Sequence, residues 1–583
     1  MDIFFKRMIM TLCVSCTISV SYALTFTVDK ITYETLSDNT VKVTGFTFSL
    51  KEVIIPSTVE YKNVEYQVKE IGYKGLYGYI SNSEVSKMES LVISEGVEKI
   101  GGLGVACNRY LKTVSLPASL KEIGNKAFYS LGALQEYTIP DSNNLTRIGE
   151  EAFYECPNLF KGKPLLLPTG ITEIGSKAFY KNNFTSVVIP KNVTIINTET
   201  FASCSLLTSA ILHNGITRIE NSAFKSDKQL DYLDYDFPEN LEYIGDGAFY
   251  GVPGIKHLIL HGNLGKINAT SFGSCKNLEY VWVKEGITSI EMDAFRACEK
   301  LKYIILPSTL KTIKASAFGG FDNNNHINRT FVFLANNPYE TEILSVPDYY
   351  SINRPDISTY SFGLISDGDC FFVKESALSL YKTRWSLCEN NLYYKIPFNS
   401  ELSYSTNYRE FDTDYHVTAE NGNKPFIATS FTGEQAIFTS IDDGIVPAGT
   451  AVLIRKKSED NTWYQIAEQQ GAQFNTPNYL KGVTYADEIS PNTEDGFINY
   501  VLSNGEFCRF DNVGVLGDHK AYLQLPTSMA AKFSLVFDDK VTNGISEIVS
   551  KEIESDIYSL NGLRVVTPTK GIYIKGGKKF VIK

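Results

Sequence analysis

The chain has 583 residues and a formal net charge of −11. This length is too great for one compact hydrophobic core, so it implies several domains or an extended repeat architecture. The acidic balance argues against nucleic acid as a partner, because binding to phosphate backbones depends mainly on clustered Lys and Arg.

The N-terminal residues 1–23 have the pattern of a secretory signal peptide. Lys6 and Arg7 precede an apolar run from Met8 to Val20, and Ser21-Tyr22-Ala23 supplies the small residues that a signal peptidase reads. The run is shorter than the roughly 20 residues needed to cross a bilayer. We therefore expect a mature chain that begins at Leu24, has no transmembrane segment, and is secreted or held at the outer cell surface.

A repeat organises the next part of the chain. The segment LKTVSLPASLKEIGNKAF, residues 111–128, recurs in related form as FTSVVIPKNVTIINTETF and LKYIILPSTLKTIKASAF. An isoleucine stands five residues before the phenylalanine that closes each unit, and successive phenylalanines are 22 to 26 residues apart. The closing residues are Phe128, Phe153, Phe179, Phe201, Phe224, Phe249, Phe272, Phe295 and Phe318.

The pattern of one unit predicts its local structure. In Leu111-x-x-Val114-x-Leu116, apolar residues two apart face one side of a short strand, and Pro117 ends that strand. One such unit has too little interior to fold alone, so each coil must close against its neighbours in a stack. The sequence therefore predicts a mainly β solenoid of about 23 residues per unit, with parallel strands on one face and an interior phenylalanine ladder.

These units resemble the BspA-type leucine-rich-repeat family of bacterial surface proteins from the Bacteroidetes. The resemblance runs from about Val53 to Phe321, with degenerate leading units and a closing segment that contains Tyr381 and Trp385. We assign the leucine-rich-repeat solenoid to residues 24–397. The resemblance implies adhesion to a host or bacterial surface protein, or to a glycan, and it implies no single ligand.

The strand face of the solenoid is the predicted binding surface. Because side chains alternate along a strand, two columns of residues should point outward along the concave face. In early units they hold polar residues such as Thr113, Ser186 and Ser209. Later they hold the residues that we predict to form the binding site: Tyr232, His257, Ile259, Tyr280, Trp282, Tyr303 and Ile305. Two alternatives are that another segment covers these columns, or that the aromatic residues only stabilise the sheet.

Several cysteines repeat with the coil. Four of them follow the closing phenylalanine by three residues: Cys156, Cys204, Cys275 and Cys298. We interpret them as buried free thiols that act as small hydrophobic residues. If a disulfide exists, Cys370 and Cys388 are the favoured pair.

The C-terminal third has no such period. Residues 398–540 show short alternating runs separated by turn signals such as Asn421-Gly422 and Asp443-Gly444, which predicts an antiparallel β domain, a sandwich. Residues 541–583 resemble the C-terminal sorting tails of proteins exported by the type IX system, although the segment is about half as long as a full sorting domain. The alternative is that these strands complete the preceding β domain.

The sequence contains none of the common catalytic or nucleotide-binding motifs, and its 6 His provide few metal ligands or general bases. We therefore expect no catalytic residues, no metal site and no cofactor, and a secreted or cell-surface protein that binds rather than catalyses. The alternative hypothesis is an extracellular enzyme that acts on polysaccharide through paired carboxylates in the C-terminal β domain.

Overall fold

The computed structural model describes most of the repeat region and the strands beyond it. The described residues are 23–36, 39–81, 84–138, 144–230, 237–320, 327–337, 342–343, 362, 368–384, 390–397, 404–407, 415–418, 424–432, 434–455, 463–468, 471, 474, 476–483, 487–493, 495–503, 506–510, 512–516, 520–526, 532–538, 557–559, 571–575 and 578–582. The expected signal peptide, except Ala23, lies outside them, as do Tyr232 and Cys388.

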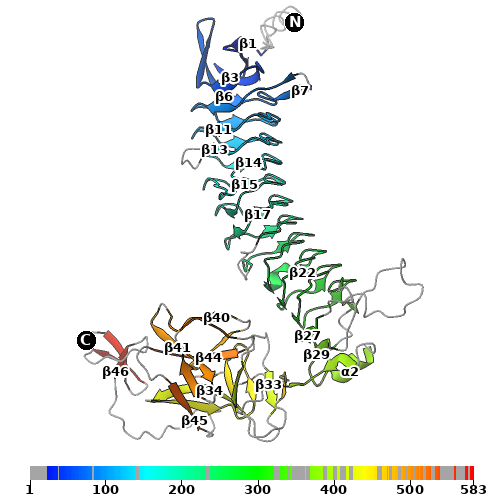
Figure 1. The fold of residues 1–583 in the computed structure, drawn as a ribbon, viewed down its shortest axis with the longest axis vertical. Helices are drawn as coiled ribbons and strands as arrows, with labels where there is room; N and C mark the ends of the chain where they lie inside the picture. The colour runs from blue at the N-terminus through cyan, green and yellow to red at the C-terminus, as the bar shows by residue number, and fades with distance from the viewer. Residues whose placement is uncertain are drawn as a thin grey trace, which may run out of the picture. The chain divides into compact units, whose positions relative to one another are not determined.

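The chain forms two compact units. The first comprises residues 1–397 with the short segment Trp463–Glu468, and the second comprises most of the remainder. In Figure 1 the first unit is a stack of coils that runs from the blue N-terminal strands to the green strands β27 and β29. The protein is mainly β, and its first unit is a solenoid of stacked coils with parallel strands, as the sequence predicted.

The coils contribute strands to two rows of parallel strands. The first row is β4 (Glu52–Ile55), β9 (Ser90–Ile93), β11 (Thr113–Ser115), β13 (Glu136–Thr138), β16 (Ser186–Val188), β18 (Ser209–Ile211), β21 (His257–Leu260), β23 (Tyr280–Val283), β25 (Tyr303–Leu306), β27 (Thr330–Phe333), β29 (Cys370–Phe372) and β30 (Leu392–Tyr393). The second row is β6 (Val64–Ile71), β10 (Lys99–Ile100), β12 (Glu122–Ile123), β14 (Arg147–Ile148), β15 (Glu173–Ile174), β17 (Ile195–Ile196), β19 (Arg218–Ile219), β20 (Tyr243–Ile244), β22 (Lys266–Ile267), β24 (Ser289–Ile290), β26 (Thr312–Ile313) and β28 (Glu342–Ile343). The isoleucine of the repeat ends each second-row strand, and from Ile71 to Ile313 its side chain is buried in the core.

Antiparallel strands begin the solenoid, and a short helix lies near its other end. At the N-terminal end β3 pairs with β2 and, in parallel, with β6. The elements outside the two rows are β1 (Thr25–Val28), β2 (Ile31–Thr35), β3 (Thr40–Phe46), β5 (Thr58–Tyr61), β7 (Tyr79–Ser81), β8 (Glu84–Val85), the 3₁₀ helix η1 (Gly262–Leu264), α2 (Leu378–Arg384), β31 (Ile396–Pro397) and β38 (Trp463–Ile466).

The closing phenylalanines form one interior ladder, which confirms the prediction from their spacing. Their rings stack between successive coils with centroid separations of 5.0 Å at Phe128–Phe153 and 5.9 Å at Phe179–Phe201. These rings belong to one buried cluster that extends from Phe26 to Leu392. The coils therefore share one continuous hydrophobic core, and no coil has a separate core of its own.

A second column of side chains donates hydrogen bonds to the backbone carbonyls of the phenylalanine turns. Cys156 donates its S–H to the carbonyl of Phe128 at 3.2 Å, and Asn182 donates to the carbonyl of Phe153 at 2.8 Å. Cys204, Cys275 and Cys298 make the equivalent contact one coil back. The cysteines are free thiols, and burial raises the pKa of Cys156 to about 12. Cys370 is also free.

Asp227 occupies this donor column as a fully buried carboxyl group. One oxygen, Oδ1, accepts the backbone N–H of Cys204 at 2.8 Å, whereas Oδ2 has no hydrogen-bond partner among the described residues. Burial raises the pKa of Asp227 well above its usual range, and burial also raises that of the adjacent Cys204 thiol. The equivalent side chains of this column donate a hydrogen bond, and a protonated Asp227 carries an O–H that could do the same. We therefore expect this carboxyl to be neutral in the native protein.

We predict that Asp227 makes stability decrease with rising pH. In the unfolded chain an Asp carboxyl has a pKa of about 3.9. Because the native pKa is higher, the folded state binds the extra proton, and the resulting stability is lost as the pH rises towards the native pKa. Asp227→Asn stays neutral and keeps a donor. Its free energy of unfolding should exceed that of the wild type by a difference that grows by up to about 1.4 kcal/mol per pH unit in this window. Urea unfolding of both proteins at pH 4, 6 and 8 measures this difference in free energy. A difference that does not vary with pH would contradict a raised native pKa for Asp227.

The second unit contains a nine-stranded sheet whose pairings are antiparallel except for β35 with β45. Its core includes Phe426, Phe438, Tyr500 and Phe533. The strands of this unit are β32 (Tyr404–Asn407), β33 (Tyr415–Thr418), β34 (Lys424–Thr432), β35 (Gln435–Ser440), β36 (Ile445–Val446), β37 (Val452–Arg455), β39 (Leu480–Val483), β40 (Asp487–Ile489), β41 (Phe497–Ser503), β42 (Glu506–Arg509), β43 (Gly514–Leu516), β44 (Lys520–Pro526), β45 (Lys532–Asp538), β46 (Ile557–Ser559), β47 (Gly571–Lys575) and β48 (Lys578–Ile582). In the tail, β46, β47 and β48 form a three-stranded antiparallel sheet.

Candidate interaction surface

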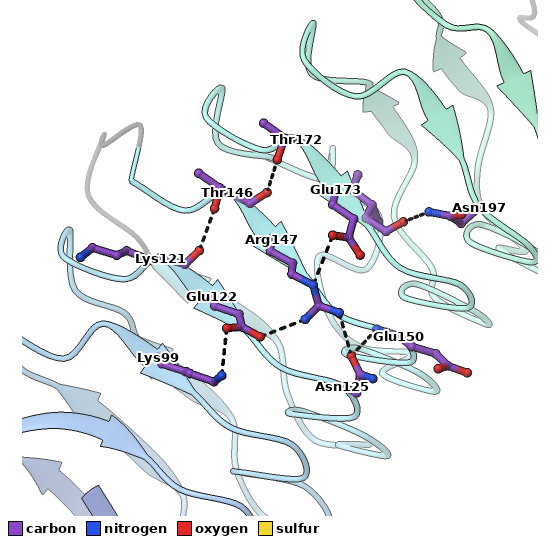
Figure 2. Close-up of polar contacts among 11 residues, drawn as sticks. Lys99, Lys121, Glu122, Asn125, Thr146, Arg147, Glu150, Thr172, Glu173 and Asn197 are labelled. Carbon is purple, nitrogen blue, oxygen red and sulfur yellow. Dashed lines mark hydrogen bonds and ion pairs between the residues drawn. The ribbon is translucent and has the colours of Figure 1, made fainter. Parts of the chain in front are cut away.

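Over the four strands β10, β12, β14 and β15, the exposed side of the second row carries charged residues that pair with one another. Lys99 contacts Glu122 at 3.0 Å, Glu122 contacts Arg147 at 3.0 Å, and Arg147 contacts Glu173 at 3.3 Å, one residue from each of four successive coils (Figure 2). Asn125 also accepts a hydrogen bond from Arg147. Exposed pairs of this kind contribute about 0–1 kcal/mol each. This column joins neighbouring coils, and its charges already have partners within the chain.

The first row places the predicted site residues in two columns. His257, Tyr280 and Tyr303 are aligned across β21, β23 and β25, and Ile259, Trp282 and Ile305 are aligned beside them. The rings of Tyr280 and Tyr303 stack with centroids 4.7 Å apart. The structure therefore brings six of the seven residues together; the seventh, Tyr232, lies outside the described residues.

Four of these six residues are not exposed. Tyr280, Trp282, Tyr303 and Ile305 are buried, and Trp282 keeps only 4% of its surface accessible. The strand alternation predicted that these four side chains would form an exposed surface, and for these positions that prediction is wrong. Stacking between adjacent strands accounts for part of the burial, because the rings cover one another, and the Lys284 ammonium lies 3.1 Å from the centre of the Trp282 ring. His257 and Ile259 are half-buried. A binding role for all seven residues stays a prediction.

The accessible apolar surface of the first row lies earlier in the stack, where the sequence predicted polar columns. Leu166, Val188 and Ile211 are 68%, 60% and 46% exposed. Val188 and Ile211 are register partners, and the bridge between Leu165 and Val187 aligns Leu166 with Val188. These three side chains form a contiguous aliphatic column on successive coils, named here the aliphatic column.

The aliphatic column has a signal in the sequence that the prediction overlooked. The units read LLLP, SVVIP and SAIL, with three apolar residues in succession. A strand can turn only alternate residues inward, so the middle residue of such a run must face outward. Ser186 and Ser209 lie in the neighbouring outward column and are half-buried. The aliphatic column itself is therefore apolar and carries no charge.

The described residues contain no group of three or more His, Cys, Asp or Glu that could hold a metal ion. Within the part of the chain that the structure describes, no helix combines the length and hydrophobicity needed to cross a membrane. In the second unit the carboxylate of Asp442 accepts hydrogen bonds from Ser440 and Lys424, which lower its pKa. This is the behaviour of a structural ion pair, and it gives no support to a general acid at that position.

Comparison with known proteins identifies the repeat. The family model described as "BspA type Leucine rich repeat region" matches residues 81–208, 142–236 and 194–325 in overlapping copies. No curated protein matches the chain.

Solved structures of bacterial leucine-rich-repeat proteins are similar to the chain. A leucine-rich repeat protein from Bacteroides ovatus is 26% identical, with 56% of this chain and 80% of that chain covered and a TM-score of 0.46. A leucine rich cell surface protein from Faecalibacterium prausnitzii is 25% identical, with 54% and 95% covered and a TM-score of 0.35. The pneumococcal vaccine antigen PcpA is 18% identical, with 64% and 96% covered and a TM-score of 0.35. The chain thus carries a leucine-rich-repeat solenoid whose residues 81–325 match the BspA type.

Proposed function

We propose that the chain is an exported surface protein that binds another protein through the first-row face of its solenoid. The observation that carries this proposal is the aliphatic column of Leu166, Val188 and Ile211. Soluble proteins rarely expose contiguous apolar side chains without using them, and the apolar centre of an interface is where most binding energy arises.

A protein partner suits this surface better than a glycan or a nucleic acid. The aliphatic column offers no charge to pair with phosphate, and it has no ring on which a sugar could stack. Its side chains sit on a rigid parallel ladder, so they lose little conformational freedom on binding. The half-buried His257 and Ile259 lie on the same row, several coils further along.

Export is a further part of the proposal. It is supported by the signal-peptide pattern of residues 1–23 and by the match of the repeat to a type described from bacterial surface proteins. The tail, residues 541–583, is proposed as a sorting segment because of its resemblance to type IX tails.

The proposed binding is tested with a triple variant, Leu166→Ser, Val188→Ser and Ile211→Ser. Because these side chains are already exposed, the midpoint of urea unfolding should change little, whereas binding of the purified protein to intact epithelial or bacterial cells should fall about tenfold or more. Substituting Tyr280 or Trp282 would not be equivalent, since their burial means that packing would be lost as well.

A matched control is the pair Ile195→Ser and Met292→Ser, two exposed apolar residues outside the first row. This variant should bind as the wild type does. Treating the target cells with protease should abolish binding, while removing surface glycans should not. Unchanged binding by the triple variant, or binding that survives protease and is lost with the glycans, would overturn the proposal.

A further inference from the structure

A pocket lies at the N-terminal end of the solenoid, several coils before the aliphatic column. It has a volume of about 620 Å³ and is lined by β3 and by the segment from residue 74 to β7. This volume lies within the range of about 300–1,000 Å³ found for small-molecule sites. The lining residues are Thr44, Gly45, Phe46, Phe48, Lys74, Gly75, Tyr77 and Tyr79.

The walls of the pocket are aromatic and only partly covered. The rings of Phe46 and Phe48 lie 5.2 Å apart in a tilted arrangement, and both are half-buried, as are Tyr77 and Tyr79. Phe46 also packs against the hydrophobic core, whereas Phe48 is not part of that cluster. Ring faces that border an open space can stack on the C–H face of a ligand ring, and the tyrosine hydroxyls and Thr44 supply polar groups beside them.

The charge of the pocket is positive. Lys74 is exposed, and its ammonium lies 5.3 Å from the centre of the Tyr77 ring. The guanidinium of Arg109 lies 5.1 Å from the centre of the Tyr79 ring. No Asp or Glu occurs among the lining residues. A hydrogen bond with Cys107, together with burial, raises the pKa of Tyr77 to about 12, so this hydroxyl stays neutral and does not repel an anion.

The floor of the pocket depends on a glycine. A Cβ at Gly75 would collide with the carbonyl oxygen of Val43, so only glycine allows the segment to lie this close to β3. The next residue back, Lys74, holds a left-handed backbone conformation with φ of 56°. The backbone therefore fixes where the Lys74 side chain leaves the chain.

From this combination we infer that the pocket binds a carboxylate-bearing sugar, such as a uronic acid residue of an acidic glycan. The aromatic walls take the C–H faces of the pyranose ring, the hydroxyl groups meet the sugar hydroxyls, and Lys74 pairs with the carboxylate. This site is separate from the proposed protein-binding column and does not depend on it.

The inference is tested on the full chain with two matched probes, methyl β-glucuronide and methyl β-glucoside, by isothermal titration calorimetry and saturation-transfer NMR. The glucuronide should bind more tightly than the glucoside. Phe48→Ala should abolish binding of both sugars. Lys74→Gln should weaken the glucuronide about fivefold, as expected for loss of one exposed ion pair, and leave the glucoside unchanged.

Tyr110→Ala is the control, because Tyr110 is an exposed aromatic residue outside the pocket. This variant should bind as the wild type does. Thermal unfolding of each variant checks that the fold is intact. The absence of glucuronide binding at about 10 mM, tenfold above a Kd of about 1 mM, would overturn the inference. So would wild-type binding by Phe48→Ala, or stronger binding of 3-phenylpropionate than of the glucuronide, which would assign the pocket to an aromatic acid instead.

Discussion

Replacing Phe224 with alanine should lower the free energy of unfolding by about 3–5 kcal/mol, the usual cost of removing a fully buried phenylalanine ring. The ring is completely buried and stacks between Phe201 at 5.6 Å and Phe249 at 5.4 Å. The effect should also spread along the stack, because each coil is stabilised mainly by its two neighbours. Urea unfolding gives the free energy, and native-state hydrogen exchange should show lost protection in the adjacent coils.

The stacked tyrosine column provides the control for this prediction. Tyr154 lies between Tyr129 at 5.0 Å and Tyr180 at 4.9 Å, so its ring contacts resemble those of Phe224, but its side chain is half-exposed. Tyr154→Ala should therefore cost only about 0.5–1.5 kcal/mol. Equal costs for the two substitutions would mean that stacking, rather than burial, holds the coils together.

Replacing Arg329 with methionine should also cost about 3–5 kcal/mol, because it leaves a buried carboxylate without its counter-charge. Arg329 and Asp369 are both fully buried, with Nη2 and Oδ2 2.8 Å apart. The guanidinium also donates to the carbonyls of Phe318 and Phe362 at 3.1 and 2.7 Å. The Arg329 side chain thus joins the last phenylalanine turn of the repeat to Phe362 and Asp369, which lie 33 and 40 residues beyond Arg329 in the chain.

The exposed ion pairs of Arg147, drawn in Figure 2, provide the matched control. Arg147 contacts Glu122 and Glu173 near the surface, and Arg147→Met should cost no more than about 1 kcal/mol. Combining Arg329→Met with Asp369→Leu should recover part of the loss, since no uncompensated charge then remains. Urea unfolding of the four proteins measures both effects. A cost below about 1 kcal/mol for Arg329→Met alone would show that the interior tolerates the lone carboxylate.

The sequence by itself determined the repeating part of this protein. The fixed interval between isoleucine and phenylalanine was enough to predict the parallel rows and the ring ladder, because every coil repeats the same backbone path and therefore places equivalent residues in the same column. The same argument predicted that Cys156, Cys204 and their equivalents would be buried thiols. It also aligned Tyr280 with Tyr303, and Trp282 with Ile305.

The tertiary structure alone decided which outward residues are accessible. Alternation along a strand says that Trp282 and Val188 both leave the core, but one is buried and the other exposed. That difference depends on the surrounding side chains, such as Lys284 over the Trp282 ring, whose positions the alternation pattern does not contain. Arg329 with Asp369, 40 residues apart, and the pocket between β3 and Lys74 arise in the same way. Local periodicity sets the direction of a side chain, whereas long-range packing sets its environment.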